Sequence, residues 1–190
     1  MKITLLVGTV VGSKTNTALS IMKEYVEKQF SDETSHVQVI NLADYELQFS
    51  DGRNYLEYEG DTGYVTQQLM DSDVIIFGTP VFQASLPGTL KNIFDLLPPQ
   101  ALLGKVVGIV VTAGSSKHYL VAEQQLKPIL SYMKAQIVQT YVFIEEKDFA
   151  QKTITNDDVL FRMERLAEDI KLQADLYQAI QAKKDEQYGF

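Results

Sequence analysis

The chain of 190 residues carries a net charge of −8, with 25 acidic against 17 basic side chains, and contains no cysteine. The acidic balance argues against a surface for nucleic acid or for anionic membranes, which both attract clusters of lysine and arginine. Without cysteine there is no disulfide, thiolate nucleophile or cysteine-ligated metal site, so electron transfer has to use a bound cofactor. The two histidines, His36 and His118, are too far apart in the sequence to predict a metal site.

Strands and helices alternate along the chain. Apolar runs predict five strands, at Lys2–Val7, Val37–Leu42, Asp73–Gly78, Lys105–Thr112 and Ile137–Ile144. Helical spacing of apolar residues predicts helices at Thr17–Phe30, at Pro87–Leu97, at Leu120–Met133, interrupted or bent near Pro128, and from about Asn156 to Lys183. The polar, tyrosine-rich interval Ala43–Asp61 fits neither pattern. We expect it to form a loop that reaches over the end of the sheet or takes part in a subunit contact.

The strand pattern predicts the fold class. Several strands are apolar at every position, which indicates a sheet covered by helices on both faces. The alternation then predicts an α/β fold with a doubly wound, five-stranded parallel sheet, in one domain over residues 1–190. The final helix, residues 155–183, carries an apolar stripe from Val159 to Tyr177 that predicts core packing or an oligomer contact. Ligands in such folds bind outside the carboxyl ends of the strands.

The loop after the first strand, Gly8–Thr17, reads GTVVGSKTNT. It has neither the glycine spacing of a P-loop nor a G-x-G-x-x-G pattern. Hydroxyl and amide side chains follow its glycines at the mouth of a helix, where unpaired backbone N–H groups and the helix dipole favour an anion. The same residue types also cap helices and form turns. From this stretch alone, a phosphate site and a purely structural loop both remain open.

Two further loops are expected to lie beside the first one. Residues 79–85, TPVFQAS, hold an aromatic ring and an apolar pair but no acid or base, and residues 112–118, TAGSSKH, are rich in glycine and serine. The three loops together predict an anion site next to an apolar wall, which suits a planar ring attached to a phosphate, such as flavin mononucleotide (FMN). A flavin loop needs no acid or base, because the cofactor carries the electrons and the protein binds and orients it.

Residues 73–98, DVIIFGTPVFQASLPGTLKNIFDLLP, and residues 102–138 resemble the NADPH-dependent FMN reductase family of flavodoxin-like proteins. The chain is especially similar to the flavin reductases of two-component alkanesulfonate monooxygenase systems, over roughly residues 1–149. In the family, the loop after the third strand lies against the flavin and precedes a G-x-L-K-x-x-x-D helix, here with Gly88 and Asp95 at its ends. A glycine-rich loop with a nearby histidine follows the fourth strand, matched here by Gly114, Ser115 and His118.

The resemblance also implies which residues hold the flavin, and it implies no catalytic acid or base. Around the ring it places Pro80, Val81, Phe82 and Gln83, together with Gly114 and Ser115 from the adjacent loop. Around the phosphate it places Thr9, Ser13, Thr15, Asn16 and Thr17. Two departures stand out: the first loop lacks the arginine that the family often has, and Phe82 replaces a usual tyrosine. The second change removes a hydrogen bond to the ring edge but keeps the stacking area.

The activity implied by the resemblance is that of a cytoplasmic NAD(P)H:FMN oxidoreductase. Its cofactors would be FMN and NADPH or NADH, and its product could supply a partner monooxygenase. Because members of the family are usually oligomers, the resemblance also implies a homodimer or homotetramer. Three alternatives remain: an FMN-containing quinone, azo or nitro reductase, a flavodoxin-type electron carrier without NAD(P)H turnover, and a flavodoxin-like domain that binds no flavin.

Overall fold

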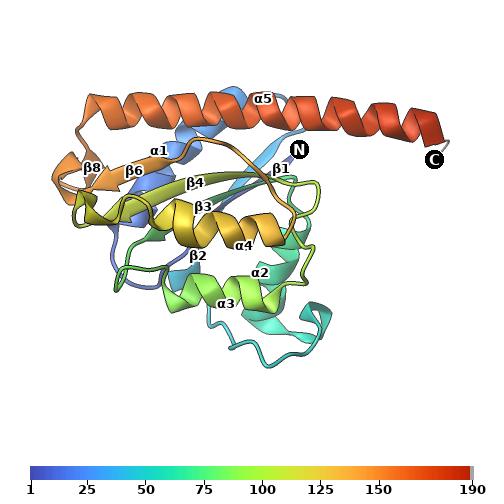
Figure 1. The fold of residues 1–190 in the computed structure, drawn as a ribbon, viewed down its shortest axis with the longest axis horizontal. Coiled ribbons are helices and arrows are strands. Elements are labelled where there is room, and N and C mark those ends of the chain that lie inside the picture. The colour runs from blue at the N-terminus through green and yellow to red at the C-terminus, as the bar shows by residue number, and fades with distance from the viewer. Residues whose placement is uncertain (189–190) are drawn as a thin grey trace.

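The computed structural model describes residues 1–188 and has a parallel sheet at its centre (Figure 1). The strand order is β2-β1-β3-β4, and β5 and β6 both pair with β4 at the edge of the sheet. The strands are β1 Lys2–Val7, β2 His36–Asn41, β3 Val74–Pro80, β4 Val106–Ala113, β5 Gln136–Ile137 and β6 Val142–Glu145. The predicted doubly wound α/β class is confirmed, and the order of the strands reverses between β1 and β3.

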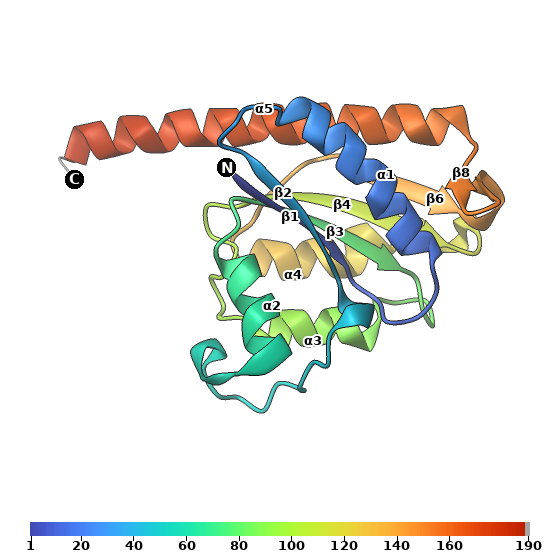
Figure 2. The ribbon, with the colours of Figure 1, turned by 180° about the vertical axis from the view of Figure 1, so that it is seen from behind.

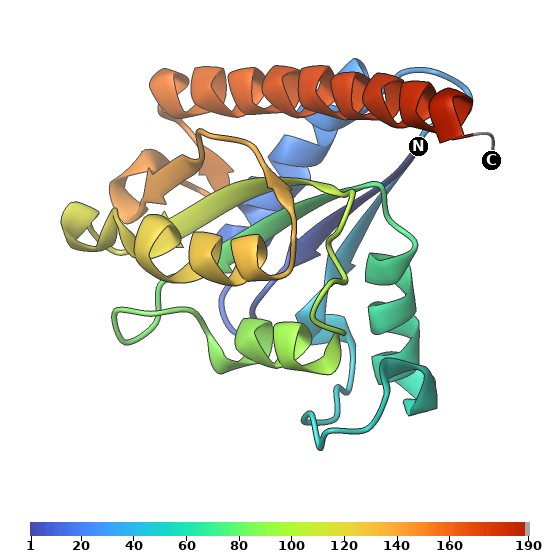
Figure 3. The same ribbon diagram turned by 45° about the vertical axis from the view of Figure 1, so that its right-hand side comes forward.

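Helices cover both faces of the sheet (Figures 2 and 3). On one face lie α1 Lys14–Gln29 and α5 Asp157–Tyr188, and on the other lie α2 Gly60–Met70, α3 Gly88–Leu96 and α4 Lys127–Tyr132. All seven residues of β3 are buried between these layers, which explains why its sequence is apolar without alternation. The predicted stripe on α5 belongs to the core, with Met163 and Ile170 fully buried. No helix among residues 1–188 is long and apolar enough to cross a membrane.

The fifth strand is interrupted, so the prediction of one continuous strand over Ile137–Ile144 is wrong in this respect. β5 ends at Ile137 and β6 begins at Val142, and the two pair with opposite ends of β4. Between them, the Gln139 carbonyl accepts a 2.8 Å hydrogen bond from Nζ of Lys127. A side-chain contact replaces the sheet ladder there, and residue spacing alone does not reveal it.

The segment before β3 forms a helix that the sequence analysis did not predict. The sequence of α2, GDTGYVTQQLM, contains two glycines and buries threonines beside only two apolar side chains, Val65 and Leu69. Its apolar stripe is therefore too sparse to stand out. The loop before α2 packs against α3: the N–H of Ser50 donates to Oδ1 of Asn92, and Nδ2 of Asn92 donates to the Gln48 carbonyl, both at 2.9 Å.

The predicted helix over Leu120–Met133 is irregular in its first half. A wide π-type turn spans Ala122–Leu126, and α4 follows with Pro128 in its first turn. The predicted interruption near Pro128 is thus present, as the change from the π-type turn to α4 just before the proline, because proline fits the start of a helix and not its interior. After β6, a hairpin of β7 Phe149–Ala150 and β8 Thr153–Ile154 leads into α5.

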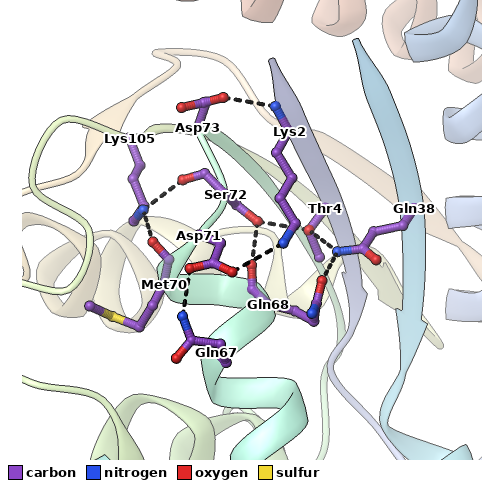
Figure 4. A network of polar contacts seen from close by, with 10 residues as sticks. All are labelled: Lys2, Thr4, Gln38, Gln67, Gln68, Met70, Asp71, Ser72, Asp73 and Lys105. Atoms are coloured by element: carbon purple, nitrogen blue, oxygen red, sulfur yellow. Dashed lines mark hydrogen bonds and ion pairs between the residues drawn. The ribbon is translucent and has the colours of Figure 1, made fainter. Parts of the chain in front are cut away.

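A polar network ties α2 to the amino ends of the central strands (Figure 4). Nζ of Lys105 donates to the carbonyls of Met70 and Ser72, each at 2.6 Å, and so binds the carboxyl end of α2. The backbone N–H of Lys2 donates to Oδ2 of Asp73 at 2.7 Å. Burial of the ammonium group lowers the pKa of Lys105. The cation also complements the negative end of the helix dipole.

We expect the substitution Lys105→Met to lower the free energy of unfolding by about 1–2 kcal/mol. The carbonyls of Met70 and Ser72 lose their hydrogen-bond donor, while a flexible apolar side chain of similar length is kept. Urea denaturation measures this. Lys23→Met is the matched control, since Lys23 forms an exposed pair with Glu27 four residues away and such pairs contribute at most about 0.5 kcal/mol. Equal losses in the two variants would contradict a structural role for Lys105.

Candidate functional site

The loops that follow β1, β3 and β4 meet at one edge of the sheet and enclose a cavity of about 380 Å³. This volume lies within the usual range for small-molecule sites, and the position is the one that ligands occupy in doubly wound folds. The residues that line it are Val11, Gly12, Ser13, Lys14, Thr15, Pro80, Val81, Phe82, Thr112, Ala113, Gly114 and Glu146. The expected meeting of the three loops is therefore confirmed.

The first loop turns sharply so that α1 begins at the cavity. The N–H of Gly8 donates to the carbonyl of Gly78 at 2.8 Å, and a Cβ at Gly8 would stand 3.0 Å from that same oxygen. Thr9 is buried, and its hydroxyl bonds the N–H and the carbonyl of Val11, both at 3.1 Å. Thr9 thus shapes the loop and does not line the cavity.

Ser13 and the start of α1 form the polar end of the cavity. Ser13 occupies the cap position of α1, but its side chain makes no capping hydrogen bond, so the hydroxyl is available to a ligand. The first N–H groups of a helix have no intrahelical acceptor, and here they belong to residues that line the cavity. Thr15 instead bonds Thr112 of β4 through their hydroxyls at 2.7 Å, in a buried contact that fixes α1 against the sheet.

The second loop places an aromatic ring at the cavity by means of a tight turn. The N–H of Phe82 donates to the carbonyl of Ser85 at 3.0 Å, and the N–H of Ser85 returns the bond at 2.9 Å. Between them Gln83 and Ala84 adopt φ values of 49° and 59°, a left-handed conformation that costs roughly 1–2 kcal/mol per non-glycine residue. The N–H of Val81 donates to the Thr112 carbonyl at 3.0 Å, which anchors the start of the loop.

An ion pair crosses the polar end of the cavity. Nζ of Lys14, at the start of α1, contacts Oε1 of Glu146, which follows β6. Both side chains are substantially exposed, at 44% and 64%, so the pair is open to solvent and to an incoming ligand. The sequence analysis assigned no role to Glu146. Its position two residues after the fifth predicted strand was the available signal, because the carboxyl ends of parallel strands share one edge.

The structure brings together six of the eleven predicted site residues: Ser13, Thr15, Pro80, Val81, Phe82 and Gly114 line the cavity. The other five, Thr9, Asn16, Thr17, Gln83 and Ser115, lie in the same loops but are not among the lining residues. Asn16 and Thr17 fall on the second half of the first turn of α1, and the side chain of Gln83 is on the turn that presents Phe82.

Comparison with known proteins shows what the chain as a whole is similar to. Residues 1–149 match the NADPH-dependent FMN reductase family. An NAD(P)H-dependent FAD/FMN reductase of Geobacillus thermodenitrificans is 37% identical over 90% of this chain and 91% of its own length.

The chain belongs to the NADPH-dependent FMN reductase family.

A further curated protein and two solved structures are also similar to this chain. An FMN reductase (NADPH) of Escherichia coli is 44% identical over 43% of this chain and 42% of its own length. Among solved structures, an oxidoreductase from Corynebacterium diphtheriae is 28% identical, covers 90% of this chain and 95% of its own, and has a TM-score of 0.75. An NADH:FMN oxidoreductase in its apo form has a TM-score of 0.73 at 23% identity, over 90% of this chain and 89% of its own.

Membership of the family confirms the main functional predictions. This FMN reductase is an oxidoreductase enzyme of flavodoxin-like fold, with FMN and NADPH or NADH as its cofactors. The alternatives of an electron carrier without NAD(P)H turnover and of a domain that binds no flavin are therefore not favoured. The residues that contact the flavin stay a prediction.

Proposed function

We propose that the cavity at the ends of β1, β3 and β4 is the FMN site of this reductase, with the flavin phosphate at the start of α1. The observation that carries the proposal is that the cavity lining combines the polar residues Ser13 and Lys14 at the start of α1 with the apolar residues Pro80–Phe82 and with Gly114 from two other loops. This donor set suits a phosphate monoester joined to a planar ring. When bound, FMN accepts hydride from NAD(P)H, and the chain's part is to bind and orient the rings.

The ring wall can hold the flavin without acid–base chemistry. Phe82 is 39% exposed at the cavity, so it has free aromatic surface to lie beside a second ring. The turn at Gln83 and Ala84 is held by Gln125, whose Nε2 donates to the Ala84 carbonyl at 3.2 Å. A wall held in this way would cover one face of the flavin ring and leave the other face to the nicotinamide, and proximity of the two rings would then supply much of the rate.

The proposal extends to the biological setting. We place the enzyme in the cytoplasm, where its nicotinamide and flavin nucleotides are available, as a homodimer or homotetramer that binds neither nucleic acid nor membranes. Its reduced flavin would supply a partner monooxygenase. The relatives named as NADH-dependent FMN reductases support a flavin-supplying role, since their names specify flavin itself as the acceptor.

The test is NADPH and NADH oxidation by the purified protein, with the visible spectrum recorded beforehand and with free FMN titrated. Oxidation that saturates with added FMN supports a reductase that releases its flavin. Oxidation by an already yellow protein that needs a quinone, azo dye or nitro compound instead would establish the reductase alternative with bound FMN. Absence of oxidation by either nucleotide at saturating FMN would overturn the assignment.

The ion pair at the cavity leads to a specific prediction for FMN affinity. A phosphate at the start of α1 competes with the carboxylate of Glu146 for the ammonium of Lys14, and it is repelled by that carboxylate. We expect Glu146→Gln to tighten FMN binding by about 3–10-fold, in line with roughly 1 kcal/mol for an exposed charge interaction. Fluorescence titration measures the effect.

Riboflavin, which lacks the phosphate, is the control ligand for Glu146→Gln and should bind both proteins alike. Equal tightening for riboflavin and FMN would show that Glu146 acts on the ring or on the loops. It would then have no part in phosphate binding.

A further inference from the structure

A second cavity lies beside the proposed flavin cavity and shares two of its loops. It has a volume of about 520 Å³, which is enough for part of a nucleotide. Its lining includes Ala84, on the turn that carries Phe82, and Ser116, which lies two residues after Gly114 in the loop that follows β4. We call this cavity, which is lined by Ala84 and by residues of the segment 116–125, the outer pocket. None of the residues proposed to hold the flavin lines it.

The outer pocket has basic side chains but no acidic side chain in its lining. Lys117 and His118 both belong to it. The acidic residue of the same segment, Glu123, lies outside the lining and pairs with Lys127. In the part of the chain that the structure describes, no carboxylate forms an ion pair with Lys117. In a protein of net charge −8, a cavity lined by one sign of charge favours an anionic ligand.

Next to the basic residues, the outer pocket offers a surface for a flat base. Tyr119 and Leu120 line it and are 50% and 51% exposed. The ring of Tyr119 is held in place by Tyr141 and Phe143, whose ring centroids lie 5.5 and 5.4 Å away. Aromatic side chains stack on bases, and the amide of Gln124 adds a hydrogen-bond donor and an acceptor. Cation, aromatic surface and amide together suit a phosphorylated nucleoside.

We propose that the outer pocket binds the adenosine end of the nicotinamide nucleotide, and that Lys117 and His118 bind the 2′-phosphate that distinguishes NADPH from NADH. This assignment rests on the proposed function, because the nicotinamide has to reach a flavin in the neighbouring cavity. A dinucleotide joins its two halves through a flexible pyrophosphate, so two cavities that share their loops suit its two ends. Relatives are named for NADH as well as for NADPH, so membership of the family does not decide the preference of this chain.

Nucleotide preference gives the first test. We expect kcat/KM of the wild type to be at least about tenfold higher for NADPH than for NADH, as a charge-assisted hydrogen bond to a phosphate allows. Lys117→Gln should lower kcat/KM for NADPH by about tenfold, through KM, and should leave the value for NADH within about twofold. Lys117→Arg should keep the preference, because it keeps the charge. Lys183→Gln is the matched control: it removes the same charge from an exposed position on α5, which contributes no residue to the outer pocket.

A binding measurement tests the same assignment without turnover. We expect isothermal titration calorimetry to show that adenosine 2′,5′-bisphosphate binds the wild type at least about tenfold more tightly than adenosine 5′-monophosphate. Lys117→Gln should abolish this difference, and its affinity for FMN should match that of the wild type. Circular dichroism verifies that each variant is folded.

Equal kcat/KM for NADPH and NADH in the wild type would overturn the proposal and would leave FMN reduction itself intact. Equal losses for the two nucleotides in Lys117→Gln would also overturn it, because Lys117 would then contact a part that both nucleotides share. A failure of the proposed function has a different result, which is no oxidation of either nucleotide at saturating FMN, and it would overturn this assignment as well.

Discussion

We expect the Ser13→Asp variant to fold like the wild type and to bind FMN about 100-fold more weakly. Aspartate is as good a residue as serine at the start of a helix, and its charge complements the helix dipole, so the stability of α1 is kept or raised. The carboxylate of the introduced aspartate would also lie at the start of α1, where the proposed site binds the flavin phosphate. Two unit charges about 4 Å apart repel by up to about 4 kcal/mol near a protein surface, and screening reduces this toward the 2.7 kcal/mol of a 100-fold change.

Two controls separate phosphate binding from a general disturbance of the loop. Riboflavin turnover by Ser13→Asp should match that of the wild type, because riboflavin has no phosphate to repel. Ser13→Asn, which has nearly the same shape as aspartate but no charge, should keep FMN binding within about threefold. If riboflavin and FMN lose affinity equally, the phosphate does not lie at the start of α1 and the proposed orientation of the flavin is wrong.

The second large effect is expected for Gly78→Ala in β3. A Cβ at Gly78 would stand 2.6 Å from both Cγ and Cδ1 of Leu19, a fully buried residue of α1. Cγ can move away only by a change of χ1 in a fully buried side chain or by a movement of α1, so we expect a loss of about 2–4 kcal/mol in the free energy of unfolding, at or above the usual cost of overpacking. Since α1 begins at the cavity, the shift should also weaken FMN binding.

Gly108→Ala in β4 is the matched control for Gly78→Ala. A Cβ there also meets an atom at 2.6 Å, but that atom is Cδ1 at the tip of Ile170, and Cγ1 of this residue is already 3.3 Å away. A change of rotamer relieves this contact, so we expect a loss of about 1 kcal/mol. Urea denaturation of both variants decides the matter: equal losses would show that α1 accommodates the added methyl group without moving.

Local apolar patterns were enough to predict most of the fold. β1 coincides with the predicted strand, and β3 and β4 are displaced by one or two residues, because strands that are buried on both faces require apolar side chains at every position. The apolar pattern failed to predict two elements whose form depends on tertiary packing. The sparse stripe of α2 and the interruption of the fifth strand at Gln139 depend on neighbours from distant parts of the chain.

For the candidate site as well, one part could be predicted from the sequence and another part could not. Its three loops could be predicted because parallel strands end at a common edge, and six of the predicted residues do line the cavity. The sequence did not show which residues of each loop face inward. Thr9 turns its hydroxyl to Val11, and Glu146 reaches Lys14 across the cavity from a segment 132 positions away.

By itself the sequence determined the fold class, the family and the position of the loops that line the cavity, since each depends on residue patterns within short segments. Only the tertiary structure decided which loop residues line the cavity, that Lys14 and Glu146 form a pair, and which apolar residues of α5 are buried. The physical reason is that burial is a property of the whole packed chain. Leu172 and Ile170 are equally apolar in the sequence, and only the position of the sheet makes one a core residue and leaves the other at the surface.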